Sequence, residues 1–211
     1  MPGWQVLHDE LAEHGFQVIA VAIDEAADAL RDYIRDHTDG ITYPVLMDSD
    51  HLLTELYAIS NVPTVLLIDE SDTIVQPNWN AYATDTFKDF TGIDSGDQLD
   101  AIRRWVIDGE TLMTADDARG AVDDLTEEEE QARLHFRLAV HLRNAGDTTG
   151  SERNFDRACQ LAPNDWTIRR ASLPLRGGDP FGPEFFELLA EFDEAGRPYH
   201  GVNHSGLPTA P

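Results

Sequence analysis

The feature that most constrains this chain is an almost unbroken apolar run, FQVIAVAI, over residues 16–23. Several of its residues are β-branched, and Asp24 ends it. A run without alternation of apolar and polar residues is typical of a strand buried on both faces of a parallel sheet. Because parallel strands need crossover connections, usually helices, the run predicts an α/β architecture around it.

Helical and strand patterns alternate on both sides of this run. Helices are predicted over residues 4–14, 26–37, 50–58 and 97–107, and further strands over residues 43–47, 64–68 and 73–76. The last two strands are joined by the polar turn Asp69–Asp72, which indicates an antiparallel hairpin. Strands that alternate with helices imply right-handed crossovers. Residues 1–110 are therefore expected to form a mixed sheet flanked by helices.

An irregular insertion follows the predicted hairpin, over residues 78–96. It carries four aromatic residues, Trp79, Tyr82, Phe87 and Phe90. Two interpretations are open: the aromatic side chains line a binding groove, or they anchor a long loop to the core.

Beyond Gly109 the strand patterns stop and helical patterns take over. Thr126 followed by Glu129 predicts a capping box at the start of a helix that runs to about Asn144. Leu134, Leu138 and Leu142 step by four along one face of this helix, which predicts its apolar face. A second helix over residues 150–161 carries Phe155 and Ala158 inward and ends before Pro163. A third is predicted near residues 166–173, and Pro183 opens a last one that runs to Glu194.

The first two of these helices resemble one tetratricopeptide repeat. The matching positions are Leu138, Ala139, Phe155, Ala158 and Pro163, whereas Ser151 stands where a small alanine is usual. A single repeat cannot stack into a solenoid, so we expect it to pack on the first domain or on a protein partner. Residues 111–196 are thus predicted to be a helical extension, and residues 197–211, which lack apolar periodicity, a flexible tail.

Charge and hydropathy exclude several classes of partner. Lys and Arg total 15 and Asp and Glu total 40, for a formal net charge of −25. Such a chain repels nucleic acid and anionic membrane surfaces. No stretch approaches the ~18 apolar residues of a membrane span, and Met1–Trp4 lacks the pattern of a secretion signal. A cytoplasmic protein is expected. Its acidity, with Lys88 as the single lysine, fits a high-salt cytoplasm or high genomic GC content equally well.

The candidate chemical groups are few. One cysteine, Cys159, cannot form an internal disulfide, a CxxC pair or a cysteine-rich zinc site, and a free cysteine is usually a small buried hydrophobe. His135 and His141 are six residues apart and do not share a helix face, while His200 and His204 lie in the tail. No Walker loop, GxGxxG or GxSxG occurs. We therefore expect no metal site and no cofactor.

Two acidic residues, Asp24 and Asp48, follow adjacent predicted strands. They would lie at the carboxyl edge of the sheet, where α/β proteins place functional groups. They could tune a neighbouring thiol, but a role in ending strands and capping helices explains both without function.

Four segments, FQVIAVAID, YPVLMD, YAISNVPT and VLLIDESDTIV, give the chain a specific resemblance. In this order and spacing, residues 1–107 resemble the TlpA/ResA branch of the thioredoxin superfamily, with peroxiredoxin-type redoxins (AhpC/TSA-like) as a related second match. The resemblance implies a thiol–disulfide oxidoreductase with a protein or small thiol or disulfide as substrate. It implies that Pro63 is the cis-proline beside a redox site, and that the loop of Val62, Pro63 and Thr64 offers main-chain hydrogen bonds to an extended substrate.

The chain also departs from this family. There, a WCxxC dithiol follows an amino-terminal strand and opens the first helix, whose dipole lowers the thiol pKa. Here Met1–Trp4 resembles the middle of that helix, so the strand and both cysteines are missing and the truncated sheet would have a central gap. No catalytic residue is assigned. Either the coding start was placed too late or the protein is a shortened, redox-silent relative.

Whether this chain is an enzyme therefore stays open at this point. The prediction is a thiol–disulfide oxidoreductase family protein that is redox-inactive as the 211-residue chain. The alternative is a non-catalytic protein-binding module, built on a thioredoxin fold and a helical repeat.

Overall fold

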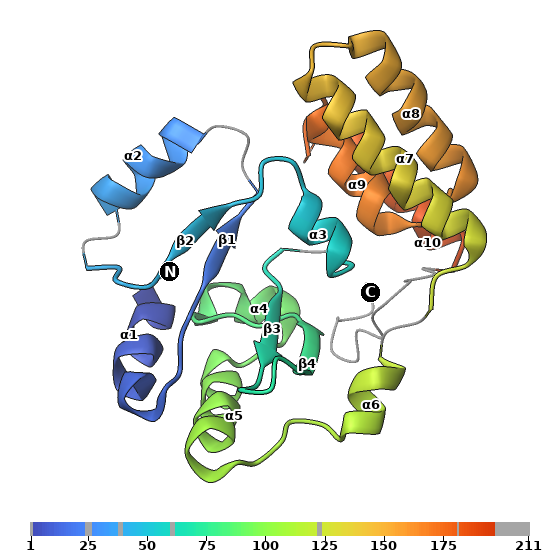
Figure 1. Cartoon of the computed structure of the whole chain (residues 1–211). Helices are drawn as coiled ribbons and strands as arrows, with labels where there is room; N and C mark the ends of the chain where they lie inside the picture. The colour runs from blue at the N-terminus through green and yellow to red at the C-terminus, as the bar shows by residue number, and fades with distance from the viewer. Residues whose placement is uncertain are drawn as a thin grey trace. The chain divides into compact units, whose positions relative to one another are not determined.

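The computed structural model describes residues 2–23, 27–37, 40–59, 62–121, 124–180 and 182–196. The chain divides into two compact units that interleave in sequence (Figure 1). The first contains the described parts of residues 1–49 and 62–120, and the second those of residues 50–61 and 121–203. The predicted tail, residues 197–211, lies outside the described residues.

The first unit follows the alternation of helix and strand that the sequence predicts. Its elements are α1 (Pro2–Leu11), η1 (Ala12–His14), β1 (Ala20–Ala22), α2 (Ala27–His37), β2 (Val45–Met47), β3 (Val65–Ile68), β4 (Ile74–Trp79), η2 (Asp85–Phe87), α4 (Lys88–Thr91), α5 (Ser95–Asp108) and α6 (Ala115–Gly120). The strands form a parallel pair, β1–β2, and an antiparallel pair, β3–β4, so both kinds of pairing are present.

β1 is shorter and more exposed than the apolar run predicts. Pairing with β2 places Ala20 opposite Val45, and the amide of Asp48 donates to the carbonyl oxygen of Ala22 at 2.8 Å. Ile19, just before the strand, is 58% exposed. The prediction of a strand buried on both faces was wrong, because β2 is the single strand that pairs with β1 among the described residues.

The β3–β4 hairpin is formed as predicted, around a turn built on Asp69. Its carboxylate accepts hydrogen bonds from the amides of Ser71, at 2.9 Å, and Thr73, at 3.0 Å. Hydrogen bonds to this carboxylate, that of the Ser71 hydroxyl first, hold the pKa of Asp69 below its ordinary value. β4 continues beyond the predicted strand to Trp79, which lies opposite Val65.

The core of the first unit joins α1, β3 and α5. Arg103 on α5 also binds the carboxylate of Glu10 on α1 through two hydrogen bonds of 2.8 Å each. The side chains that are buried in this core are Leu7, Leu11, Leu67 and Ile102.

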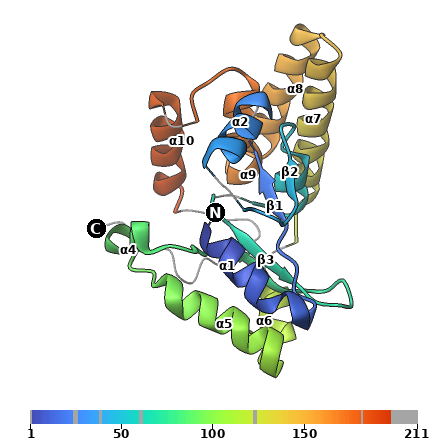
Figure 2. The same ribbon diagram turned by 90° about the vertical axis from the view of Figure 1, so that its left-hand side faces the viewer.

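The second unit is entirely helical in its described part. It contains α3 (Leu52–Leu56), α7 (Glu127–Asn144), α8 (Thr148–Leu161), α9 (Trp166–Leu175) and α10 (Pro183–Glu194). The predicted capping box of α7 is present: the Glu129 amide donates to the Thr126 hydroxyl, and the Glu129 carboxylate accepts from the Thr126 amide at 2.8 Å. α7 packs along α8, and α9 lies between this pair and α10 (Figure 2).

The buried face of α7 differs from the predicted leucine face. Leu134 is 61% exposed and Leu138 is 45% exposed. Phe136 is buried instead and meets Phe155 of α8 edge-to-face, with 5.8 Å between ring centroids. The prediction was wrong because alanines, not leucines, set the contact: short side chains let the two helices approach closely. The residues that α7 contributes to this core are Ala132, Phe136, Ala139 and Val140.

A separate aromatic cluster joins α9 to α10. Trp166 stacks on Phe192 with 4.8 Å between ring centroids. Leu188 is buried in the same cluster. α10 begins at Pro183, as predicted, because a proline at the first position of a helix needs no amide partner.

Candidate functional site

The loop of Val62, Pro63 and Thr64 leads directly into β3. The Val62–Pro63 peptide bond is cis. Val62 is 46% exposed and Pro63 is also exposed, whereas Thr64 is half-buried. The loop thus presents the apolar side chain of Val62 at the surface of the first unit.

The strand that follows this loop has one paired edge. β3 pairs with β4, and within the described residues no strand pairs with the opposite edge of β3. An unpaired strand edge carries amide and carbonyl groups that can bind an extended peptide. The loop and this edge are therefore chemically suited to main-chain recognition.

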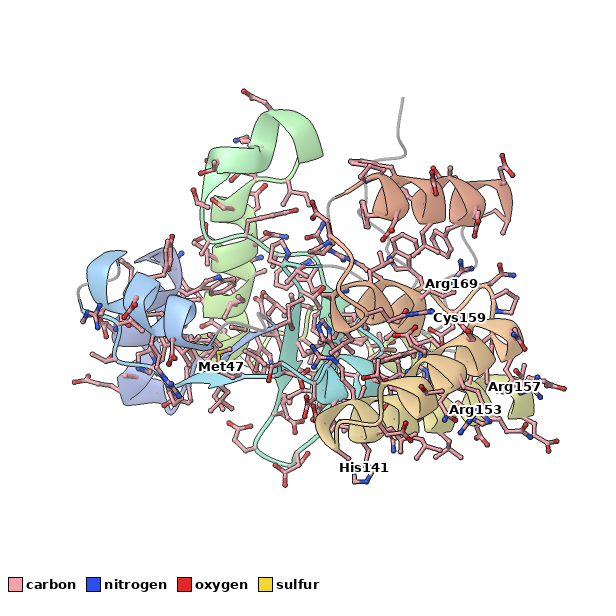
Figure 3. The ribbon with its side chains drawn as sticks, turned by 90° about the horizontal axis from the view of Figure 1, so that it is seen from above. Met47, His141, Arg153, Arg157, Cys159 and Arg169 are labelled. Carbon is pink, nitrogen blue, oxygen red and sulfur yellow. The ribbon has the colours of Figure 1, made fainter. Side chains whose placement is uncertain are left out.

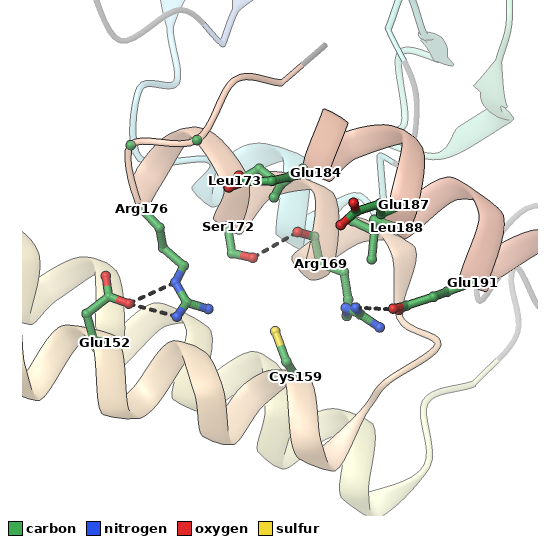
Figure 4. A pocket seen from close by; sticks show the side chains of 12 residues that line it. Glu152, Cys159, Arg169, Ser172, Leu173, Arg176, Glu184, Glu187, Leu188 and Glu191 are labelled. Carbon is green, nitrogen blue, oxygen red and sulfur yellow. Dashed lines mark hydrogen bonds and ion pairs between the residues drawn. The ribbon is translucent and has the colours of Figure 1, made fainter. Parts of the chain in front are cut away.

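The single thiol of the chain lies elsewhere, in the second unit. Cys159 lines a cavity of about 570 Å³ formed by α8, α9 and α10 (Figure 4). Burial raises the pKa of the Cys159 thiol above its ordinary value. The charges of Arg169 and Arg176 act in the opposite direction but are weaker than burial. Because the thiolate is the nucleophile in thiol chemistry, these surroundings suppress the reactivity of Cys159.

Both guanidinium groups at this cavity are already paired with carboxylates. Arg169 donates to Glu191 at 3.0 Å, and Arg176 donates to Glu152 at 2.9 Å (Figure 4). Each arginine therefore has a carboxylate partner, and its effect on the Cys159 thiol is weaker than that of burial.

Of the histidines and acidic residues singled out from the sequence, His135, His141 and Asp48 belong to the described part of the chain, whereas His200 and His204 lie outside it. His135 shares a hydrogen bond of 2.8 Å with Asn154, and His141 is exposed on α7 (Figure 3). Asp48 is buried after β2, whereas Asp24 lies outside the described residues. Across the described ranges, no group of three or more His, Cys, Asp or Glu side chains could hold a metal ion.

The aromatic insertion is described in part. Trp79 is half-buried against the core of the first unit, which is the anchoring role. The amide of Tyr82 donates to the side-chain oxygen of Gln98 at 2.9 Å, so this loop is tied to α5. The side chains of Phe87 and Phe90 lie outside the described part of the structure.

Sequence reasoning missed a buried charged cluster in the second unit. Glu55, Arg133 and Asp165 are each at most 5% exposed, and Arg133 binds both acidic residues. One signal was available in the sequence, because Glu55 lies within the apolar pattern LLTEL. None of the described helices is both long and apolar enough to span a lipid bilayer.

Comparison with known proteins supports the resemblance of the amino-terminal region to redoxins. Residues 1–76 match the AhpC/TSA family. Thiol-disulfide oxidoreductase ResA from Bacillus thuringiensis (strain Al Hakam) and ResA from Bacillus anthracis are each 28% identical to this chain over 76 residues. Each alignment covers 36% of this chain and 43% of the relative, so the chain spans less than half the length of these curated relatives. No solved structure matches the chain significantly. Taken with the strands and helices described above, the amino-terminal region of this chain is a thioredoxin-like redoxin domain.

Proposed function

We propose that this protein is a TlpA/ResA-like member of the thiol–disulfide oxidoreductase group that performs no redox turnover as the 211-residue chain. The observation that carries the proposal is the setting of its one thiol. Cys159 lies in the helical unit and outside residues 1–76, which match the redoxin family, and burial raises its pKa.

The chemistry of disulfide exchange explains why one protein thiol cannot complete a cycle without an external thiol. A thiolate attacks a disulfide sulfur and forms a mixed disulfide, and one thiolate leaves. A second thiol must then attack the mixed disulfide to release the reduced product. Cys159 has no second cysteine in the chain to complete this cycle.

What the thioredoxin-like domain retains is a surface for substrate recognition. We assign that role to Val62, Pro63 and Thr64, which lead into β3, a strand that pairs along one edge only among the described strands. Main-chain recognition of this kind suits an extended protein segment or a small thiol or disulfide compound. Val62 adds an exposed apolar contact.

The test is reduction of insulin by dithiothreitol, followed as turbidity when the B chain precipitates. The wild-type chain and Cys159→Ser are compared with dithiothreitol alone. We expect both proteins to leave the rate unchanged. An acceleration by the wild-type chain that Cys159→Ser abolishes would assign catalysis to Cys159 and overturn the proposal.

A non-catalytic protein-binding module is the second candidate. It is favoured by the exposed leucines on α7, Leu134 and Leu138. Equilibrium binding of intact insulin, a disulfide-bonded probe, separates the two candidates. Weaker binding by Val62→Asp supports recognition by the thioredoxin-like loop, whereas weaker binding by Leu138→Gln alone supports the helical surface.

A further inference from the structure

A buried ionic cluster in the second unit fixes α3 against the later helices. Glu55 of α3 is 2% exposed, Arg133 of α7 is 5% exposed and Asp165 is 1% exposed. Charged side chains are rarely buried to this extent unless they are paired, because removing a charge from water is strongly unfavourable. The three groups must therefore stay together for the unit to remain packed.

The hydrogen bonds of the cluster engage nearly every face of the Arg133 guanidinium. Nε donates to Oδ2 of Asp165 at 3.0 Å, and Nη2 donates to Oδ1 at 3.3 Å. Nη1 donates to the main-chain carbonyl oxygen of Glu55 at 2.6 Å and lies 3.7 Å from its carboxylate. The Arg133 side chain thus contacts both the backbone and the side chain of Glu55 in α3.

A second arginine of α7 completes the shell around the Glu55 carboxylate. Arg137 donates to it through Nε at 2.5 Å and Nη2 at 3.2 Å. This pairing raises the pKa of the Arg137 guanidinium above its ordinary value. Two cations on successive turns of α7 are therefore directed at one carboxylate of α3.

The other end of the segment is also tied to α7. The side-chain amide of Asn144 donates to both carboxylate oxygens of Asp50 at 3.1 Å. Asp50 precedes α3 and Asn144 ends α7, so the segment runs antiparallel along that helix. Contacts at both ends fix its register on α7.

This segment belongs by sequence to the thioredoxin-like region but by packing to the helical unit. Residues 50–59 lie inside the 1–76 family match, yet they are part of the second unit. The ties extend beyond α3 itself, since the amide of Ile59 donates to the carbonyl oxygen of Thr54 at 2.8 Å. Val62, where the chain re-enters the first unit, follows Ile59 by three residues.

We propose that Glu55, Arg133 and Asp165 are positioning residues through which the helical unit holds the segment that enters the Val62–Thr64 loop. The helical extension then controls how that loop is presented, without contacting a substrate itself. That this positioning affects substrate binding rests on the proposed function. The positioning itself, through Glu55, Arg133 and Asp165, is tested with no substrate present.

The experiment is hydrogen–deuterium exchange of the full chain, read by mass spectrometry on peptides that cover residues 52–59 and 62–68. Glu55→Gln keeps the side-chain shape and removes its charge, and Arg133→Met removes the guanidinium. Arg153→Met is the matched control, because Arg153 is exposed on the outer side of α8 (Figure 3). We expect exchange roughly tenfold faster in both peptides for the two cluster variants, with no change for the control.

Two further variants separate positioning from general stability. Arg133→Lys keeps the charge and should restore part of the protection that Arg133→Met loses. Asn144 is exposed, so Asn144→Ala should fold and should accelerate exchange in residues 52–59. This variant keeps the test valid if the cluster variants do not fold. Unchanged exchange in residues 52–59, or faster exchange there with no effect in residues 62–68, would overturn the proposal. Neither result depends on the insulin assay.

Discussion

Truncation of Phe136 tests which face of α7 is buried. The side chain is 1% exposed and its ring meets Phe155 at 5.8 Å between centroids. Phe136→Ala should cost about 3–5 kcal/mol of stability, of which the aromatic pair accounts for roughly 0.5–1.5 kcal/mol. Leu138, two residues further along the same helix, is 45% exposed. Since full burial of a leucine stabilises by about 1.5–3 kcal/mol, roughly half of that, about 1 kcal/mol, is the expected cost of Leu138→Ala.

Urea unfolding followed by circular dichroism at the helix band measures both variants. With a slope of about 2 kcal/mol/M, a loss of 4 kcal/mol lowers the midpoint of the helical transition by roughly 2 M, and a loss of 1 kcal/mol by roughly 0.5 M. Both substitutions, Phe136→Ala and Leu138→Ala, lie in the middle of α7 and introduce the same residue. Equal midpoint shifts, or a larger shift for Leu138→Ala, would refute the assignment of the buried face.

Three other predictions concern stability and thiol reactivity. Gly3→Ala should destabilise the first unit by about 1–3 kcal/mol in a thermal melt, because the added Cβ would lie 2.0 Å from the carbonyl oxygen of Ala83; an unchanged melting temperature would contradict that close approach. The hydrogen bond with Arg103 lowers the pKa of Glu10, so its contribution is present above the ordinary carboxyl pKa and is lost as pH falls through the lowered value. Glu10→Gln should therefore reduce the loss of melting temperature between neutral and acidic pH, and an identical pH profile would argue against the pair. Because burial raises the pKa of Cys159, iodoacetamide at mildly alkaline pH should alkylate it slowly in the folded chain and rapidly in urea; equal rates would show that the thiol is accessible.

Local signals predicted much of this fold. The β3–β4 hairpin follows from a polar turn between two apolar runs, and the start of α7 follows from Thr126 and Glu129. Pro183 marks the start of α10 in the same way. Each of these features depends on residues a few positions apart, so a single sequence contains the information.

Features that depend on distant contacts were not predictable in this way. The buried face of α7 is set by how closely α8 approaches, which leucine spacing does not report. Arg133 and Glu55 are 78 residues apart, and a charged residue in a sequence is normally read as exposed. The Val62–Thr64 loop was predicted from the family resemblance. The burial of Glu55 with Arg133 and Asp165 became evident only in the structure.

The interleaving of the two units has a consequence for synthesis on the ribosome. At about 5–20 residues per second, Arg133 is added roughly 4–16 s after Glu55, given their separation of 78 residues. During that interval neither Arg133 nor Arg137, the two arginines that bind the Glu55 carboxylate, has been added, so α3 cannot reach its final packing however early the preceding strands form. Within the nascent amino-terminal half, the segment that contains α3 must therefore wait for the downstream helices against which it packs.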